Sequence, residues 1–250
     1  MEIPDGTLAL RAFFVVMPIA LAVLTVWGVY AGAIRVGDSP ARARRLAGIV
    51  AGVAAGWMAA TWAIAASGLL LQFDLRPPPF AIVPLVMVAL GVWLARSRVG
   101  DVLARGLPLW VLVGVQSFRL PLELMMDRAA QQGVMPVQMS FAGHNFDILT
   151  GMTAAMLAIT MAMRPVPRGL VHAWNAGGLL LLVNIVVVSI LSTPVVGAYG
   201  PDRYNVWVMT APYVSLPAVM VLTAWAGHLV VFRALRVRVS PRRPSAQPGA

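Results

Sequence analysis

Four polar side chains recur along one otherwise apolar stretch of the chain, and their types and spacing suit chemistry inside a membrane. Gln116, Arg119, Glu123 and Asp127 follow one another at intervals of three, four and four residues. Because residues three or four apart are neighbours on a helix, these intervals place the four side chains near one face. Charged groups are costly to keep in hydrocarbon and are therefore enriched at functional positions. The spacing predicts a polar site centred on Arg119 and Glu123.

Three further polar residues are expected at a similar depth: Asp147, Asn184 and Tyr213. Asn184 follows Gly169, the start of its apolar run, at a distance of roughly 22 Å along a helix. Tyr213 follows Asn205 by roughly 12 Å on the same rise per residue. We therefore take as candidate ligand-binding residues Gln116, Arg119, Glu123, Asp147, Asn184 and Tyr213, around a pocket open to the outer side of the membrane.

A purely structural interpretation of these residues stays open. Arg119 and Glu123 are four residues apart and are able to pair directly, although Pro121 between them is expected to bend the helix. Such a pair would lock helices together, or would snorkel to the interface without any further role. Asp147, or Asn145 before it, would then serve as the N-cap of the helix that follows.

The connection from Met126 to Phe146 is the longest one predicted on the outer side. Gly133, Pro136 and Gly143 interrupt any continuous helix there, while its apolar residues predict that it folds onto the membrane face. The segment has the character of a lid over an outer pocket, or of a plain interfacial loop.

The elements that must position these residues follow from composition. The chain has 60% hydrophobic and 11% charged residues, far from the roughly 25% charged of soluble domains, so the composition disfavours a soluble protein and excludes a disordered one. We predict an all-α, polytopic transmembrane helical bundle in a single domain of residues 1–232, followed by a disordered basic cytoplasmic tail at 233–250. The seven predicted spans cover residues 8–34, 46–72, 80–95, 107–126, 146–163, 169–193 and 205–232.

Arginine placement predicts the orientation, with the N-terminus outside and the C-terminus cytoplasmic. Arg76, Arg128 and Arg203 are assigned to the outer side, while Arg11 and Arg119 fall within spans. The inner side receives Arg35, Arg42, Arg44, Arg45, Arg96, Arg98, Arg105, Arg164, Arg168, Arg233, Arg236, Arg238, Arg242 and Arg243. The net charge of +10 therefore marks a membrane edge and not a nucleic-acid partner. Location in a bacterial inner membrane is expected.

Small residues at four-residue intervals predict close helix packing. Gly28 and Gly32 lie in the first span, and Gly48, Gly52 and Gly56 lie in the second. The pattern favours packing of these two spans on each other, with a dimer face as the alternative.

Several runs in the second half of the chain belong together: Phe118-Arg119 with Glu123, Pro136 to Met139, Asn145 to Ile148, Trp174-Asn175 and Asn184. In these runs the chain resembles an uncharacterised family of bacterial multi-spanning inner-membrane proteins of about seven helices. The resemblance implies that these runs belong to one architecture and brings no activity or ligand with it.

Several chemistries are excluded by what the sequence lacks. It has no cysteine for thiolate chemistry, no lysine for a retinal Schiff base, and no motif of the metalloprotease, serine-hydrolase or P-loop type. His172 and His228 are expected at matched depth on consecutive helices, where a bis-histidine haem or metal site is geometrically conceivable. Ordinary uses of histidine near a helix end are the favoured interpretation.

We therefore predict an integral membrane protein with an outward-facing polar pocket in spans four to seven. It would act as a binding or sensor protein, or as a subunit of a membrane assembly, in the lipid bilayer with a small-molecule ligand from the outer side. The alternative is a small-solute or proton-coupled transporter that uses Arg119 and Glu123. No catalytic residue, metal or cofactor is assigned, and a homo-oligomer or a membrane-complex partner is left open.

Overall fold

The computed structural model describes residues 6–237, and every element of secondary structure in this range is helical. The elements are α1 (Leu8–Arg35), α2 (Pro40–Ala66), η1 (Leu69–Leu71), α3 (Pro79–Arg96), α4 (Arg98–Gly106), α5 (Leu109–Val115), η2 (Gln116–Phe118), α6 (Arg119–Gln131), η3 (Val137–Met139), α7 (Ile148–Met163), α8 (Arg168–Leu191), η4 (Pro201–Arg203), η5 (Trp207–Met209), η6 (Leu216–Val221) and α9 (Leu222–Val237). Among them η6 is a single π-helical segment that runs directly into α9.

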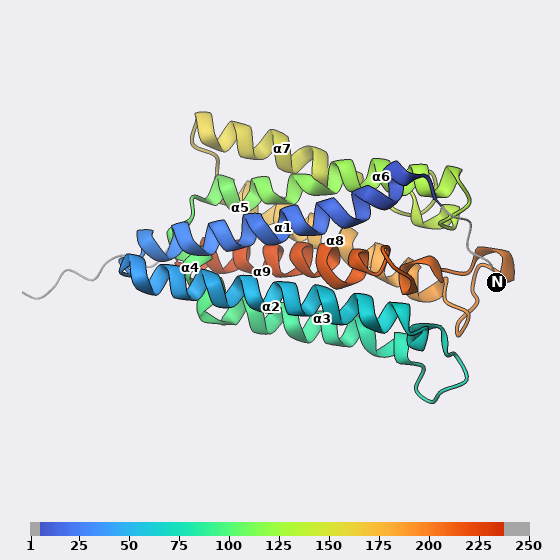
Figure 1. Ribbon diagram of the computed structural model, residues 1–250. Coiled ribbons are helices and arrows are strands. Elements are labelled where there is room, and N and C mark those ends of the chain that lie inside the picture. Colours follow the sequence, from blue (N-terminus) through green and yellow to red (C-terminus); the bar gives the residue numbers. More distant parts are fainter. Residues whose placement is uncertain (1–5, 238–250) are drawn as a thin grey trace, which may run out of the picture.

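The long helices lie roughly side by side and alternate in direction (Figure 1). At one end, which we call the α4 end, α1, α3 and α9 finish and α2, α5 and α8 begin. The opposite end, which we call the loop end, carries the connections from α2 to α3, from α6 to α7 and from α8 to η6. The described chain begins at the loop end and leaves at the α4 end.

Six helices of the described range are long and apolar enough to cross a bilayer, which is the build of a multi-pass membrane protein. They are Leu8–Arg35, Pro40–Ala66, Pro79–Arg96, Leu109–Gln131, Arg168–Leu191 and Leu216–Val237. The predicted fifth span corresponds to α7, which is apolar but has only 16 residues. The predicted all-helical membrane bundle is confirmed, while the count of seven spans stays a prediction.

The last helix begins later than the sequence predicts. Residues 205–215 form turns and the short η5, and helix starts only at Leu216. Pro212 and Pro217 explain this, because proline lacks the N–H that a helix interior needs. At the other end α9 continues to Val237, so the predicted tail begins no earlier than residue 238, and residues 238–250 lie outside the described range.

Tryptophans of α2 hold this irregular start of the last helix. Trp57 Nε1 donates to the carbonyl of Ala218 at 2.8 Å, and Trp62 Nε1 donates to Ser215 Oγ at 2.8 Å. A π-helical turn leaves its carbonyls out of the regular ladder, so donors from a neighbouring helix stabilise it.

The glycine seams join different helices from those predicted. A Cβ at Gly32 would stand 2.5 Å from the carbonyl oxygen of Val102, and Gly106 meets the Gly32 backbone even more closely, so α1 packs backbone to backbone on α4. Gly48, Gly52 and Gly56 have no such neighbour within 4 Å. Helices α1 and α2 do pack on each other, but the prediction that these glycines form their contact is wrong.

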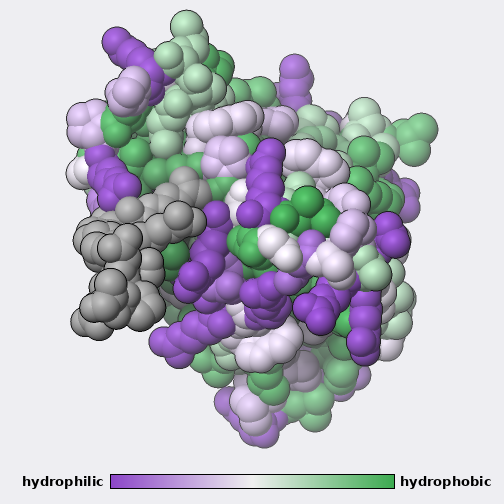
Figure 2. All heavy atoms as spheres, turned by 90° about the vertical axis from the view of Figure 1, so that its left-hand side faces the viewer, coloured by the Kyte–Doolittle hydropathy of each residue, from purple (hydrophilic) through white to green (hydrophobic). Residues whose placement is uncertain are grey.

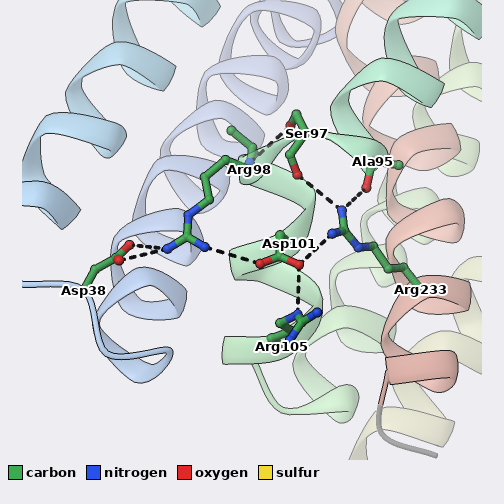
Figure 3. Close-up of polar contacts among 8 residues, drawn as sticks. Asp38, Ala95, Ser97, Arg98, Asp101, Arg105 and Arg233 are labelled. Carbon is green, nitrogen blue, oxygen red and sulfur yellow. Dashed lines mark hydrogen bonds and ion pairs between the residues drawn. The ribbon is translucent and has the colours of Figure 1, made fainter. Parts of the chain in front are cut away.

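The α4 end gathers the arginines that the sequence assigns to one side of the membrane. Arg35 ends α1, Arg96 ends α3, Arg168 starts α8 and Arg236 lies in the last turn of α9. Figure 2 looks onto this end and shows hydrophilic residues gathered across it, with hydrophobic residues around its flanks. The missed helix α4 carries Asp101, which is bonded to arginines from its own helix and from α9 (Figure 3).

Candidate functional site

A break in the fourth long helix sets the position of the central arginine. The helix runs from Leu109 to Gln131, but Gln116–Phe118 is a 3-10 turn between α5 and α6. Pro121 offers no N–H to the carbonyl four residues earlier, so the turn before it tightens. Arg119 thereby becomes the first residue of α6, halfway along the helix, and only 1% of it is exposed.

The loop between α6 and α7 returns into the bundle instead of lying on its end. It brings Asn145 and Asp147 to the middle of the fourth helix, where they are 0% and 3% exposed. Gly151 in the first turn of α7 allows this, because a Cβ there would collide with the backbone at Arg119 and Leu120. The sequence predicts that this loop lies on the membrane face. In the structure the end of the loop enters the bundle and reaches the buried Arg119.

One nitrogen of Arg119, Nη1, contacts three different parts of the bundle. Arg119 Nη1 lies 3.1 Å from Asp147 Oδ1 in a buried ion pair, 3.3 Å from the carbonyl oxygen of Gly178, and 3.1 Å from His228 Nε2. These partners belong to the loop before α7, to α8 and to α9. Among the described residues the ion pair of Arg119 is with Asp147, whereas the sequence alternative paired it with Glu123.

The histidine contact fixes a protonation state. A guanidinium has donors and no acceptor, so His228 Nε2 must accept from Arg119. His228 Nδ1 then carries the proton and donates to Asn175 Oδ1 at 2.8 Å, while Asn175 Nδ2 donates to the His228 carbonyl at 3.0 Å. This network assigns His228 as a neutral imidazole that links α8 and α9 to Arg119.

Glu123 has a partner of its own. Asn145 Nδ2 donates to Glu123 Oε2 at 2.6 Å and to the Met139 carbonyl at 3.1 Å. Asn145 Oδ1 accepts from the Asp147 backbone N–H at 3.0 Å. Asp147 occupies the N-cap position of α7 but makes no side-chain capping bond, so the capping interpretation does not describe it. Asn145 instead links the Glu123 carboxylate to the backbone at Asp147.

A largely apolar groove runs beside this cluster, with a cavity of about 250 Å³. Helices α3 and α8 form its walls, and both pack against α9. Its charged lining residues are Arg119, Glu123 and Asp147. Val88 of α3 and Val183 and Val187 of α8 line it and are 43–47% exposed, so the groove opens on the flank of the bundle.

The six predicted site residues lie in three places. Arg119, Glu123 and Asp147 come together at the groove. Gln116 is fully buried and donates to the Ala224 carbonyl at 3.2 Å, which braces α9.

The other two residues stabilise the loop end. Asn184 donates to the His144 carbonyl at 2.7 Å, which holds the returning loop on α8. Tyr213 packs its ring against Phe14 and Trp207, with ring centroids 5.3 and 5.1 Å apart. Neither residue is among those that line the groove.

The histidine pair of the sequence analysis does not form one site. His172 contacts the Arg168 carbonyl and the ring of Phe232, whereas His228 belongs to the buried network. In the described part of the chain, no group of three or more histidine, cysteine or carboxylate side chains is placed to hold a metal ion.

Asn145, Asn175 and His228 are the site residues that sequence reasoning did not assign. Asn145 was predicted only as an alternative N-cap, and Asn175 had no predicted role. His228 was considered only together with His172, and nothing in the sequence indicates its contact with Arg119.

Comparisons with known proteins add no relative. The chain matches no model of a known protein family, no curated protein and no solved structure at a significant level.

Proposed function

We propose that this protein is a membrane-embedded binding protein that takes an amphipathic molecule from the bilayer into the groove between α3 and α8. The observation that carries the proposal is the opening of an apolar groove on the flank of spanning helices, with a charged cluster at its inner wall. Exposed Val88, Val183 and Val187 would face hydrocarbon, so an apolar ligand enters without crossing water.

The proposal includes a seven-span arrangement in a bacterial inner membrane. Helix α7, the fifth in chain order, would be the additional span, and its 16 residues reach only about 24 Å, so the returning loop before it completes the crossing. The α4 end would face the cytoplasm, because it collects the arginines, and the loop end would face outward. The groove then lies in the outer half of the bilayer, on the side that the sequence predicts for the ligand.

The character of the groove disfavours a polar solute. A water-borne ion or sugar would reach Arg119 only past walls built from valine, leucine, isoleucine, methionine and aromatic side chains. Burying such a solute there would leave its polar groups without partners. We therefore propose binding of an amphiphile and not transport of a small polar solute.

The test is to fill the mouth of the groove. Val187→Trp places a large side chain at the opening, where the native residue is 46% exposed and therefore tolerates added volume. Protein purified from membranes would be washed in detergent, and its bound lipids and other amphiphiles quantified by mass spectrometry. We expect the native chain to retain about one enriched amphiphile per chain, and the Val187→Trp variant to lose it.

Val53→Trp is the matched control, because Val53 is 63% exposed on α2 and is not among the groove residues. It should retain the same amphiphile as the native chain. Identical extracts from all three proteins, with no species enriched over the membrane composition, would rule the proposal out.

A further inference from the structure

The inference concerns the chemistry of the ligand head, and it rests on the proposed function. Arg119 lines the groove and is almost fully buried. Its Nε and Nη2 are buried and make no hydrogen bond to the described part of the chain, whereas Nη1 holds Asp147, Gly178 and His228. Nε and Nη2 form one edge of the guanidinium fork, which is built to donate two parallel hydrogen bonds to an acceptor.

The need for an acceptor follows from the cost of burial. A buried donor without a partner costs the desolvation of that group, and an arginine carries its charge permanently. Nearby Glu123 accepts from Asn145 through its Oε2, and Nε and Nη2 of Arg119 have no hydrogen-bond partner among the described residues, Glu123 included. A ligand in the groove is therefore best bound when its head presents oxygen acceptors to Nε and Nη2.

The charges of the cluster decide whether that acceptor is an anion. Arg119 contributes one positive charge, which the Asp147 carboxylate balances at 3.1 Å. His228 is neutral, because its Nε2 accepts from Arg119. Glu123 adds a negative charge when ionised and none when protonated. In neither state does the cluster hold a surplus positive charge for an anionic head, and an uncompensated buried charge is strongly unfavourable.

The size of the site limits the head as well. Its cavity of about 250 Å³ is larger than the roughly 150 Å³ of an apolar cavity that holds one benzene ring. A ring or an ester group with the first part of an apolar chain fits this volume, and the open flank lets the rest of the chain lie along Val183 and Val187.

We propose that the groove binds an uncharged amphiphile whose carbonyl oxygens accept hydrogen bonds from Nε and Nη2 of Arg119. Long-chain esters and isoprenoid quinones are the two sources of this chemistry. A fatty-acid anion is disfavoured because it would add a second negative charge beside Asp147.

The experiment compares three probes with 18-carbon chains and different heads, and adds a quinone. Oleate, methyl oleate and octadecene, together with decylubiquinone, would be incubated with the detergent-purified protein and the retained probe quantified by mass spectrometry. Retention that Val187→Trp abolishes counts as binding in the groove. We expect methyl oleate or decylubiquinone to bind more tightly than octadecene by about tenfold, which corresponds to one buried hydrogen bond. Oleate should bind more weakly than its methyl ester.

Arg119→Lys supplies the second arm. It keeps the charge that balances Asp147 but removes the fork, so we expect loss of the advantage of the carbonyl probes while octadecene binding is unchanged. The native-protein series decides the question even where this variant fails to fold.

Three outcomes separate the two proposals. Tighter binding of oleate than of methyl oleate would overturn the uncharged head and leave the groove intact. Equal binding of ester, quinone and hydrocarbon would do the same. Retention of no probe, or retention that Val187→Trp does not change, would overturn the proposed function itself.

Discussion

Two clusters of arginine and aspartate lie at different depths of the same bundle. At the α4 end, Arg98 bonds Asp38 at 2.8 Å, and Asp101 accepts from Arg105 at 2.9 Å and from Arg233 at 2.6 Å (Figure 3). Their arginine side chains are 28–55% exposed. In the middle of the bundle, the Arg119 and Asp147 side chains are only 1% and 4% exposed.

The difference lies in what replaces water around each charge. At the α4 end a broken ion pair is rehydrated, and surplus arginines have solvent as a partner. Around Arg119 every partner must come from the protein or from a ligand, because hydrocarbon offers none. The same residue types therefore serve as a membrane edge in one place and as a candidate site in the other.

The largest effect is expected from removing the buried charge. Arg119→Gln leaves Asp147 without its ion pair and His228 without its donor, so the free energy of unfolding should fall by about 3–5 kcal/mol. Thermal melting of the variant in detergent, monitored by tryptophan fluorescence, measures the loss.

The double variant Arg119→Gln with Asp147→Asn removes both charges and should melt closer to the native protein than the single variant does. A double variant no more stable than the single would mean that Asp147 is not the charge that Arg119 balances. If Arg119→Gln alone had the melting temperature of the native protein, the buried cluster would be no more important for stability than the exposed one.

The sequence predicts the helices well and their contacts poorly. Hydropathy marks every long helix, because each must match the same thickness of hydrocarbon. It missed α4, since a nine-residue amphipathic helix with Arg98 and Arg105 has the composition of a polar connection. The start of the last helix was misplaced, because turns around Pro212 carry apolar residues as a span does.

The sequence predicts some residues of the candidate site but not the contacts between them. Arg119 and Glu123 stand out in sequence, because a charge in an apolar run is visible without a partner. Asp147 was expected at a similar depth. Its ion pair with Arg119 forms because the loop between α6 and α7 returns into the bundle, and no local sequence pattern predicts that path. Tyr213 looked similar by depth, yet depth does not specify the face of a helix, and its ring packs on Phe14.

A moderate effect is expected from substituting Gly151, which lets the start of α7, and with it Asp147, lie close to Arg119. Gly151→Ala would press a methyl group onto the backbone at Arg119 and Leu120, so α7 must shift, at about 1–3 kcal/mol. Thermal melting and retention of the bound amphiphile should both decline. Gly52→Ala is the matched control, since no atom lies within 4 Å of the added methyl group, and alanine favours helix. Equal melting of both variants would mean that α7 does not depend on this close approach.

The smallest effect is expected at the α4 end, and its dependence on salt sharpens the comparison most. Arg98→Gln breaks the contact with Asp38, but with the Arg98 side chain 51% exposed the loss should not exceed about 1 kcal/mol. In 1 M salt the screening length falls to about 3 Å, so the difference in melting temperature between the variant and the native protein should shrink toward zero. The loss caused by Arg119→Gln should persist in the same salt, because ions do not reach a buried pair. A salt-independent loss at Arg98 would place it in the same energetic class as Arg119, and exposure would then no longer explain why only one of the two clusters is a candidate site.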